Sequence, residues 1–248
     1  MTGRFYVAGV GPGDPELLTL KALRVIEECD IIAIPVSGQG FSEVVYENEN
    51  MKPLFPEVLD KCAAWQIVLH EIPEVLWKEK LYLPMPMMKD KAALGHIHEE
   101  AAKETAKWLD AGKNVVFITI GDPSVYSTGM YVHTRLKRKG YDTCIIPGIP
   151  SFCAAAARLD VPLAGNKDEI HIIPASYGVE EGLKLPGTKI LMKAGKKMPM
   201  VKEEVKKRNL QIQMVENCGM KGERIYESVE DIPDEASYYS LLIVKEEG

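Results

Sequence analysis

Apolar and polar positions in the first half of the chain follow two periods, which predict strands separated by helices. Short apolar or β-branched runs that are typical of strands lie at residues 5–10, 31–35, 115–120 and 143–147. Runs with the wider spacing of helices lie at residues 15–29, 96–111 and 129–138. Because strands that alternate with helices favour parallel pairing, we expect an α/β domain with a mostly parallel sheet here.

The stretch between residues 36 and 95 is harder to interpret. Residues 65–70 and 81–83 are consistent with strands, but prolines interrupt regular structure at positions 53, 56, 73, 84 and 86. We expect one more strand of the sheet in this stretch, together with a variable flap.

The pattern changes after residue 148. An alanine-rich helix is predicted at residues 151–158 and one further helix at 199–208. Short strand-like runs lie at residues 170–174, 189–193, 211–216, 224–228 and 238–245. This pattern predicts two α/β domains, residues 1–148 and 149–248, the second with a mixed sheet. We expect an active-site cleft between them, at the carboxyl ends of the first sheet's strands, where open α/β sheets bind ligands.

Composition and charge exclude several classes of protein. Of the 248 residues, 46% are hydrophobic and 27% charged, which is typical of a globular protein. A formal net charge of -6 argues against a nucleic-acid partner. The start of the chain has no apolar signal-peptide core, and no run approaches the roughly 18 apolar residues of a membrane helix, so we expect no membrane partner. An odd number of cysteines, five without a C-x-x-C pair, favours a reduced, cytoplasmic location.

Two glycine-proline turns, at residues 9–15 and 121–126, each follow a predicted strand. Glycines at 9, 11 and 13 leave no Cβ atoms to hold a ligand away, and a helix expected from about Glu16 would direct amide groups toward the same space. The first turn therefore suits an anionic or strongly polar group. A dinucleotide fingerprint fails because Asp14 stands where its last glycine belongs, and no Gly-Lys-Ser/Thr follows for a phosphate-binding loop. The alternative is that these glycines only connect strand to helix.

Histidines give no metal-site pattern. His96 and His98 are two residues apart, which places them on different sides of a helix, so we predict no metal site.

Three segments, residues 7–22, 121–127 and 147–152, resemble the tetrapyrrole methylase family in their order and spacing. The resemblance spans nearly the whole chain. It implies an enzyme that uses S-adenosyl-L-methionine in a cleft between two α/β domains and forms a homodimer.

Further details are most similar to the branch of this family that methylates C20 of precorrin-2 or cobalt-factor II in cobalamin biosynthesis. They lie at residues 34–35, 86–91, 126–128 and 238–244. Pro35 stands where uroporphyrinogen methylases carry an acidic proton acceptor, which disfavours that substrate. Pro150 stands where relatives have threonine or serine, and Ser151 is expected to replace the missing hydroxyl contact. Alternatives are another corrin intermediate, a protein or ribosomal RNA target, a non-catalytic tetrapyrrole carrier and, last, a nicotinamide dehydrogenase.

The resemblance also implies site residues. The positions that match cofactor-binding positions of the family are Pro12, Gly121, Asp122, Pro123, Val125, Tyr126, Ser151, Phe152, Met192, Lys193, Ala194, Asn217 and Met220. Asp122 accepts hydrogen bonds from the cofactor in one interpretation and forms a local turn or helix cap in the other.

The substrate carries eight carboxylates, so its site should be locally basic. Expected substrate-binding residues are Gly11, Gly13, Asp14, Lys21, Pro35 and Arg158. Further basic candidates for the carboxylates are Arg135, Lys193, Lys196 and Lys197. No residue is assigned as the catalytic base.

Overall fold

The computed structural model describes residues 2–38, 41–175 and 178–246, apart from the side chain of Lys196. The chain divides into two compact units, Met1–Ile149 and Pro150–Gly248. The predicted boundary, after residue 148, falls one residue before this division.

The first unit is built on a six-stranded sheet with the order β3-β4-β2-β5-β1-β6. Every neighbouring pair is parallel except β3 with β4, which confirms the predicted mostly parallel sheet. The strands are β1 (Phe5–Gly9), β2 (Ile31–Val36), β3 (Val45–Glu47), β4 (Glu79–Pro84), β5 (Val115–Thr119) and β6 (Thr143–Ile146).

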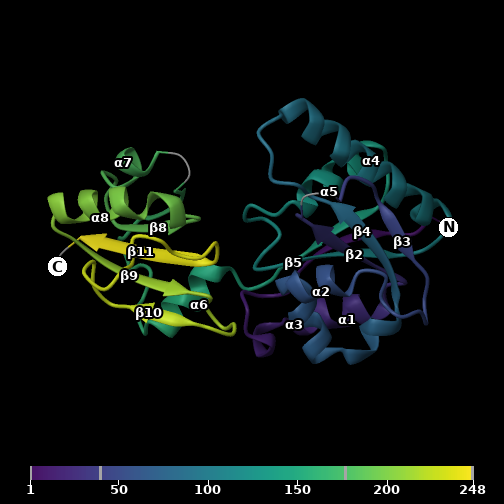
Figure 1. Cartoon of the computed structure of the whole chain (residues 1–248), viewed down its shortest axis with the longest axis horizontal. Coiled ribbons are helices and arrows are strands. Elements are labelled where there is room, and N and C mark those ends of the chain that lie inside the picture. The colour runs from purple at the N-terminus through teal and green to yellow at the C-terminus, as the bar shows by residue number, and fades with distance from the viewer. Residues whose placement is uncertain (1, 39–40, 176–177, 247–248) are drawn as a thin grey trace. The chain divides into compact units, whose positions relative to one another are not determined.

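Helices cover both faces of this sheet (Figure 1). On one face α1 (Leu20–Glu28), α2 (Pro56–Lys61) and α3 (Ala63–Glu71) pack against the apolar side chains of β1, β2 and β5. On the other face lie α4 (Lys91–Asp110) and α5 (Gly129–Arg138). The chain therefore leaves the adjacent strands β1 and β5 toward opposite faces, through α1 and α5. Such a divergence is the point at which open α/β sheets bind ligands.

Two expectations for residues 36–95 are wrong. The run at 65–70 belongs to helix α3, where Ala64, Trp65, Ile67 and Val68 are buried on one helical face. Two strands rather than one are added here, because β3 pairs antiparallel with β4 at the edge of the sheet. Short 3-10 helices, η1 (Pro15–Leu17) and η2 (Pro73–Trp77), begin at prolines of this unit.

The second unit contains a mixed five-stranded sheet with the order β10-β9-β11-β8-β7. Only β7 and β8 are parallel, and the other neighbours are antiparallel, which confirms the predicted mixed sheet. The strands are β7 (Ile170–Pro174), β8 (Thr188–Met192), β9 (Leu210–Glu216), β10 (Arg224–Tyr226) and β11 (Ser240–Glu246).

One face of this second sheet packs against α7 (Val179–Gly182) and α8 (Met198–Lys207), and the opposite face packs against α6 (Ser151–Arg158). A 3-10 turn, η3 (Gly195–Lys197), connects β8 to α8. The sequence pattern predicted α6 and α8 but not the short α7, which has four residues.

Among the described residues, no helix has the length and apolarity that crossing a membrane requires. The five cysteines are free thiols. Within the same described ranges, histidine, cysteine and acidic side chains nowhere gather in a group of three that would hold a metal ion.

Two buried histidines give the first unit a pH-dependent stability. His98 and His133 are 6% and 7% exposed, and burial is the main cause that lowers the pKa of each imidazole. Below about pH 6.5 these two imidazoles bind more protons in the unfolded chain than in the folded one. Their contribution therefore lowers the free energy of unfolding as the pH drops. We expect urea unfolding to show a smaller loss between pH 7.5 and 5.5 in a His98→Phe variant than in the wild type. Equal losses would contradict this assignment.

Candidate functional site

Three glycine-containing loops meet at the carboxyl ends of β1, β5 and β6. The backbone amide of Gly121, after β5, donates to the carbonyl oxygen of Gly11, after β1, at 2.7 Å. These two residues form an isolated antiparallel bridge. Gly148, after β6, lies against Gly121 and Gly9, because a Cβ on it would be 2.2 Å from the Gly121 oxygen and 2.8 Å from the Gly9 Cα. The segments that carry the resemblance are thus in direct contact.

The structure replaces the reason expected for Gly9 and supplies one for Gly148. A Cβ on Gly9 would lie 2.4 Å from the Gly121 oxygen and 2.8 Å from the Gly148 nitrogen. Gly9 and Gly148 are therefore required by backbone contact between loops, rather than by the approach of a ligand. Gly11 and Gly121 have φ angles of +82° and +72°, a region that favours glycine.

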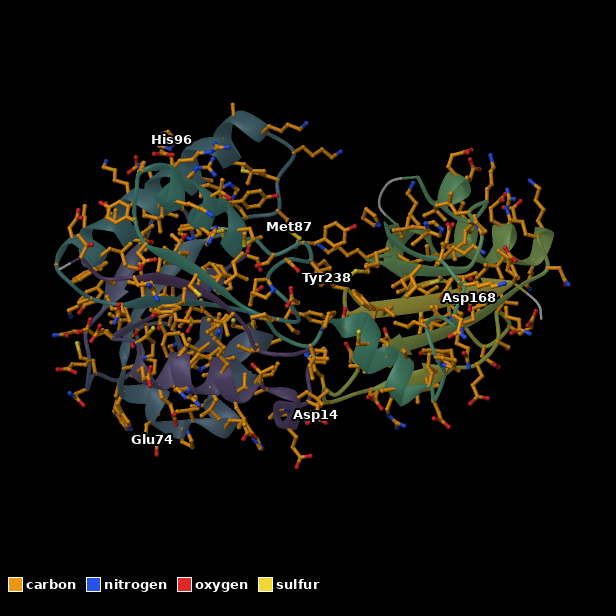
Figure 2. All side chains as sticks on the ribbon, turned by 180° about the vertical axis from the view of Figure 1, so that it is seen from behind. Asp14, Glu74, Met87, His96, Asp168 and Tyr238 are labelled. Carbon is orange, nitrogen blue, oxygen red and sulfur yellow. The ribbon has the colours of Figure 1, made fainter. Side chains whose placement is uncertain are left out.

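The structure does not support the anionic ligand expected for the first turn, whereas the alternative, a strongly polar group, stays a prediction. Helix α1 begins at Leu20, four residues later than expected, and the Thr19 hydroxyl already accepts the Ala22 amide at 3.2 Å. The Asp14 carboxylate, labelled in Figure 2, accepts the Glu16 amide at 3.0 Å and caps η1. With these amides taken and Asp14 itself negative, this edge of the sheet favours a cationic or neutral polar group.

Asp122 connects two of the loops. One carboxylate oxygen accepts the amide of Ser124 at 2.8 Å and also the Ser124 hydroxyl, and the other accepts the amide of Gly148 at 3.0 Å. This is the local turn that one interpretation of the sequence expected. A contact from Asp122 to the cofactor stays a prediction.

An Asp122→Asn substitution tests this connection. Asparagine keeps the shape but replaces one acceptor oxygen by a donor, so either the Ser124 or the Gly148 amide loses its partner. We expect a loss of about 1.5–3 kcal/mol in the free energy of unfolding, the range for hydrogen bonds to charged groups. Urea denaturation measures it, with Ser124→Ala, which retains both amide bonds, as the milder control. A variant as stable as the wild type would contradict this role.

The other predicted cofactor residues of this unit belong to the turn after β1 and to the loop after β5. Pro12 and Pro123 are buried, Val125 is half-buried, and Tyr126 is 49% exposed. Tyr126 adopts a φ of +54°, which is unusual for a residue other than glycine, asparagine or aspartate. Such conformations often occur at functional sites.

The second unit brings two further predicted segments together at one edge of its sheet. The register pairs Met192 of β8 with Leu241, and Glu216 of β9 with Ser240, so residues 192–194 and 217–220 follow neighbouring strand ends. Lys193 and Asn217 have φ angles of +61° and +53°. Ala194 is buried, whereas the Met192 and Met220 side chains are half-buried.

The third predicted segment opens helix α6. Pro150 is its N-cap residue and provides no side-chain cap. Ser151 and Phe152 are half-buried in the first turn, and Phe152 packs against the core between α6 and the sheet. The replacement of the missing hydroxyl contact by Ser151 stays a prediction.

Several candidates for the substrate carboxylates have partners within the protein. Arg158 pairs with Glu223 at 2.6 Å. Arg135 pairs with Glu99 at 3.3 Å and donates to two backbone carbonyls, which connects α5 to α4.

The remaining substrate candidates differ in exposure. Lys21 on α1 and Lys197 on η3 are exposed, Gly13 is buried, and the side chain of Lys196 lies outside the described part of the chain. Pro35 lies in β2, two residues beyond Ala33, which is the last residue of β2 that pairs with β5. The amide hydrogen that proline lacks is therefore not needed for pairing between β2 and β5.

The sequence did not show that Gly9 and Gly148 are needed for contact between the loops. It also did not point to Thr19, whose hydroxyl donates to the Pro147 oxygen at 3.4 Å. The available signal was a glycine at the end of, or two residues after, each of three strands. Parallel strands place such glycines at the same edge of a sheet.

Known proteins match the chain over most of its length. The family model described as Tetrapyrrole (Corrin/Porphyrin) Methylases matches residues 4–233. A protein of Methanocaldococcus jannaschii named probable cobalt-precorrin-2 C(20)-methyltransferase is 36% identical over 77% of this chain and 72% of its own length. The cobalamin biosynthesis protein CobIJ of Mycobacterium tuberculosis is 29% identical over 98% of this chain, which spans 46% of that protein. A precorrin-2 C(20)-methyltransferase of Sinorhizobium sp is 28% identical over 98% of this chain and 95% of its own length.

Solved structures share the fold. The cobalt precorrin-4 methyltransferase CbiF has a TM-score of 0.70 at 20% identity, over 98% of this chain and 94% of that one. Uroporphyrin-III C-methyl transferase from Thermus thermophilus, complexed with S-adenyl homocysteine, has a TM-score of 0.66 at 20% identity, over 98% of both chains. From the family match, the sequence identity and the three loops in contact, we conclude that the chain belongs to the tetrapyrrole methylase family.

Proposed function

We propose that this protein transfers a methyl group from S-adenosyl-L-methionine to C20 of precorrin-2 or of its cobalt-containing counterpart, cobalt-factor II, in cobalamin biosynthesis. The observation that carries the proposal is the direct contact of the loops at Gly11, Gly121 and Gly148. The relatives named as C(20)-methyltransferases support the choice of reaction.

The charge of these loops suits the proposed cofactor. Residues 10–18 and 121–128 contain the acidic residues Asp14, Glu16 and Asp122 and no lysine or arginine. S-adenosyl-L-methionine carries a sulfonium and an ammonium group, so negative side chains nearby favour its binding. The loops would hold it largely through backbone groups of residues 11–12 and 121–126.

The cofactor supplies an activated methyl group when bound. The residues of this chain then have to align the acceptor carbon with that methyl group and to exclude water. The bridge between Gly11 and Gly121 fixes the first loop against the second, and the Asp122 carboxylate fixes the second loop against Gly148. These contacts favour a preorganised site, which is what an in-line displacement requires.

Methyl transfer to the two forms of the substrate tests the proposal. The purified protein is incubated anaerobically with S-adenosyl-L-methionine and either precorrin-2 or cobalt-factor II. Mass spectrometry is expected to show one added methyl group, placed at C20 by NMR of the product. Methylation at another carbon would contradict the C20 assignment, and no methylation of either tetrapyrrole would contradict the proposed reaction. The substrate that is methylated faster shows whether the enzyme prefers the metal-free or the cobalt-containing macrocycle.

We also propose that the enzyme works as a homodimer in the cytoplasm, as the resemblance implies. The five free thiols are consistent with a reducing compartment. Light scattering coupled to size exclusion is expected to give about twice the chain mass, and a species of 27.6 kDa would contradict the dimer.

A further inference from the structure

Three loops of the second unit contact one another at one end of its strands, here called an edge of the sheet, where β8 and β9 end and β11 begins. The Asn217 amide donates to the Tyr239 oxygen at 3.0 Å, and the Ser237 hydroxyl donates to the Asn217 side-chain oxygen at 3.1 Å. A Cβ on Gly195 would lie 2.6 Å from the Ala236 oxygen, so the loop after β8 touches the loop before β11. This edge is therefore a built surface rather than a set of independent loops.

Two of these three loops are opposite in charge to the acidic loops described above, whereas the loop before β11 contains Asp234, which pairs with Lys202, and Glu235. Residues 193–197 and 217–222 contain no aspartate or glutamate. They contain the lysines Lys193, Lys196, Lys197 and Lys221. Lys193, Lys197 and Lys221 are exposed. Such a concentration of positive charge, in a chain with a net charge of -6, favours an anionic ligand.

Two exposed tyrosines belong to the third loop, and one of them lies beside Lys193. Tyr238, labelled in Figure 2, is 52% exposed, and Tyr239 is 39% exposed. Their rings pack edge to face, with centroids 5.3 Å apart and planes at 83°. The Lys193 ammonium nitrogen lies 5.7 Å from the Tyr238 ring centroid. The exposed Tyr238 ring next to the Lys193 ammonium matches a conjugated ring that carries carboxylates.

We propose that Lys193, Lys197, Lys221 and Tyr238, here called the basic edge, recognise the tetrapyrrole substrate. This inference rests on the proposed function and assigns its substrate contacts. The sequence gives Lys193 two expected roles, one toward the cofactor and one toward the substrate carboxylates. Charge favours the second, because the cofactor's two cationic groups outnumber its single carboxylate, whereas the macrocycle has eight carboxylates.

Steady-state kinetics with cobalt-factor II tests the basic edge. Lys193→Gln and Lys221→Gln are each expected to raise the KM for the tetrapyrrole about fivefold at low salt, close to 1 kcal/mol, while kcat and the KM for S-adenosyl-L-methionine change less than about twofold. The wild-type KM for the tetrapyrrole should rise with ionic strength, and the double variant should show a weaker rise. Lys206→Gln, which removes an exposed lysine on α8, is the control and should behave like the wild type.

The ring of Tyr238 has its own matched pair. Tyr238→Ala is expected to raise the KM for the tetrapyrrole about fivefold, within the range measured for aromatic contacts, whereas Tyr238→Phe should remain within about twofold of the wild type. If the variants raise only the KM for S-adenosyl-L-methionine, or if none of them differs from the wild type, the inference is overturned. The proposed function is not affected by either result.

Direct binding separates the inference from the proposed function if no turnover is found. Uroporphyrin I, a fluorescent octacarboxylate macrocycle, is titrated with the wild type and with the Lys193→Gln/Lys221→Gln double variant. Binding by the wild type that the double variant weakens at least about tenfold would support the basic edge without turnover. Equal binding by both proteins, or no binding by the wild type, would overturn it.

Discussion

Gly148→Ala is expected to weaken binding of S-adenosylhomocysteine at least about tenfold, or about 1.4 kcal/mol, and to destabilise the first unit. The new Cβ would lie 2.2 Å from the Gly121 oxygen and 2.8 Å from the Gly9 Cα. Both neighbours are backbone atoms, so no side-chain rotation can relieve the contact. The loops after β1, β5 and β6 would have to separate, and these are the loops that we propose hold the cofactor.

Calorimetric titration measures the affinity, and urea unfolding measures a stability loss that we expect at about 1–3 kcal/mol, as for other overpacked sites. Gly95→Ala is the matched control. Gly95 lies in α4, where a Cβ would meet nothing within 4 Å, so this variant should bind normally and be as stable as the wild type or more stable. A Gly148→Ala variant with wild-type affinity would show that contact between these loops is not needed for the site.

Glu47→Gln is expected to lower the free energy of unfolding by about 3–5 kcal/mol, because it leaves a buried ammonium group without its counter-ion. The side chains of Glu47 and Lys80 are both 0% exposed, and their charged atoms lie 2.6 Å apart. The second oxygen of Glu47 accepts the Tyr82 hydroxyl at 2.8 Å and the Leu54 amide at 2.7 Å. Burial and this carboxylate together raise the pKa of Tyr82, which keeps the hydroxyl protonated as a donor.

Urea unfolding tests this pair with two comparisons. Glu100→Gln removes a carboxylate from an ion pair whose side chains are 43% and 59% exposed, and it should change stability by less than about 0.5 kcal/mol. The Glu47→Gln/Lys80→Met double variant should recover much of the loss, since it no longer buries a lone charge. A Glu47→Gln variant as stable as Glu100→Gln would contradict the assignment.

The sequence predicted most of the fold because its strands and helices have clear periods. The pattern at residues 129–138 matches α5, and the runs at 151–158 and 170–174 match α6 and β7. The failure at residues 65–70 has a physical reason: a short apolar run without alternation fits a strand or a buried helix equally well. Strand β3 has only three residues, and its edge position depends on pairing with β4, which no local pattern encodes.

The candidate site was predictable as a set of loops but not as a set of contacts. The motifs identified the turns after β1 and β5, yet the close approach of Gly9, Gly121 and Gly148 requires the strand order of the sheet. The link from Asp122 to the Gly148 amide joins residues 26 apart in the chain, and the sequence offered two roles for this side chain without a means to choose. The ion pair of Arg158 with Glu223 also depends on tertiary structure.

Calorimetric titration of the wild-type chain with S-adenosylhomocysteine tests the central claim most directly. The loops at Gly11, Gly121 and Gly148 predict saturable binding with one site per chain, and Gly148→Ala should weaken it while Gly95→Ala should not. No detectable binding to the folded wild-type protein would contradict the claim that these loops form the site for the methyl donor.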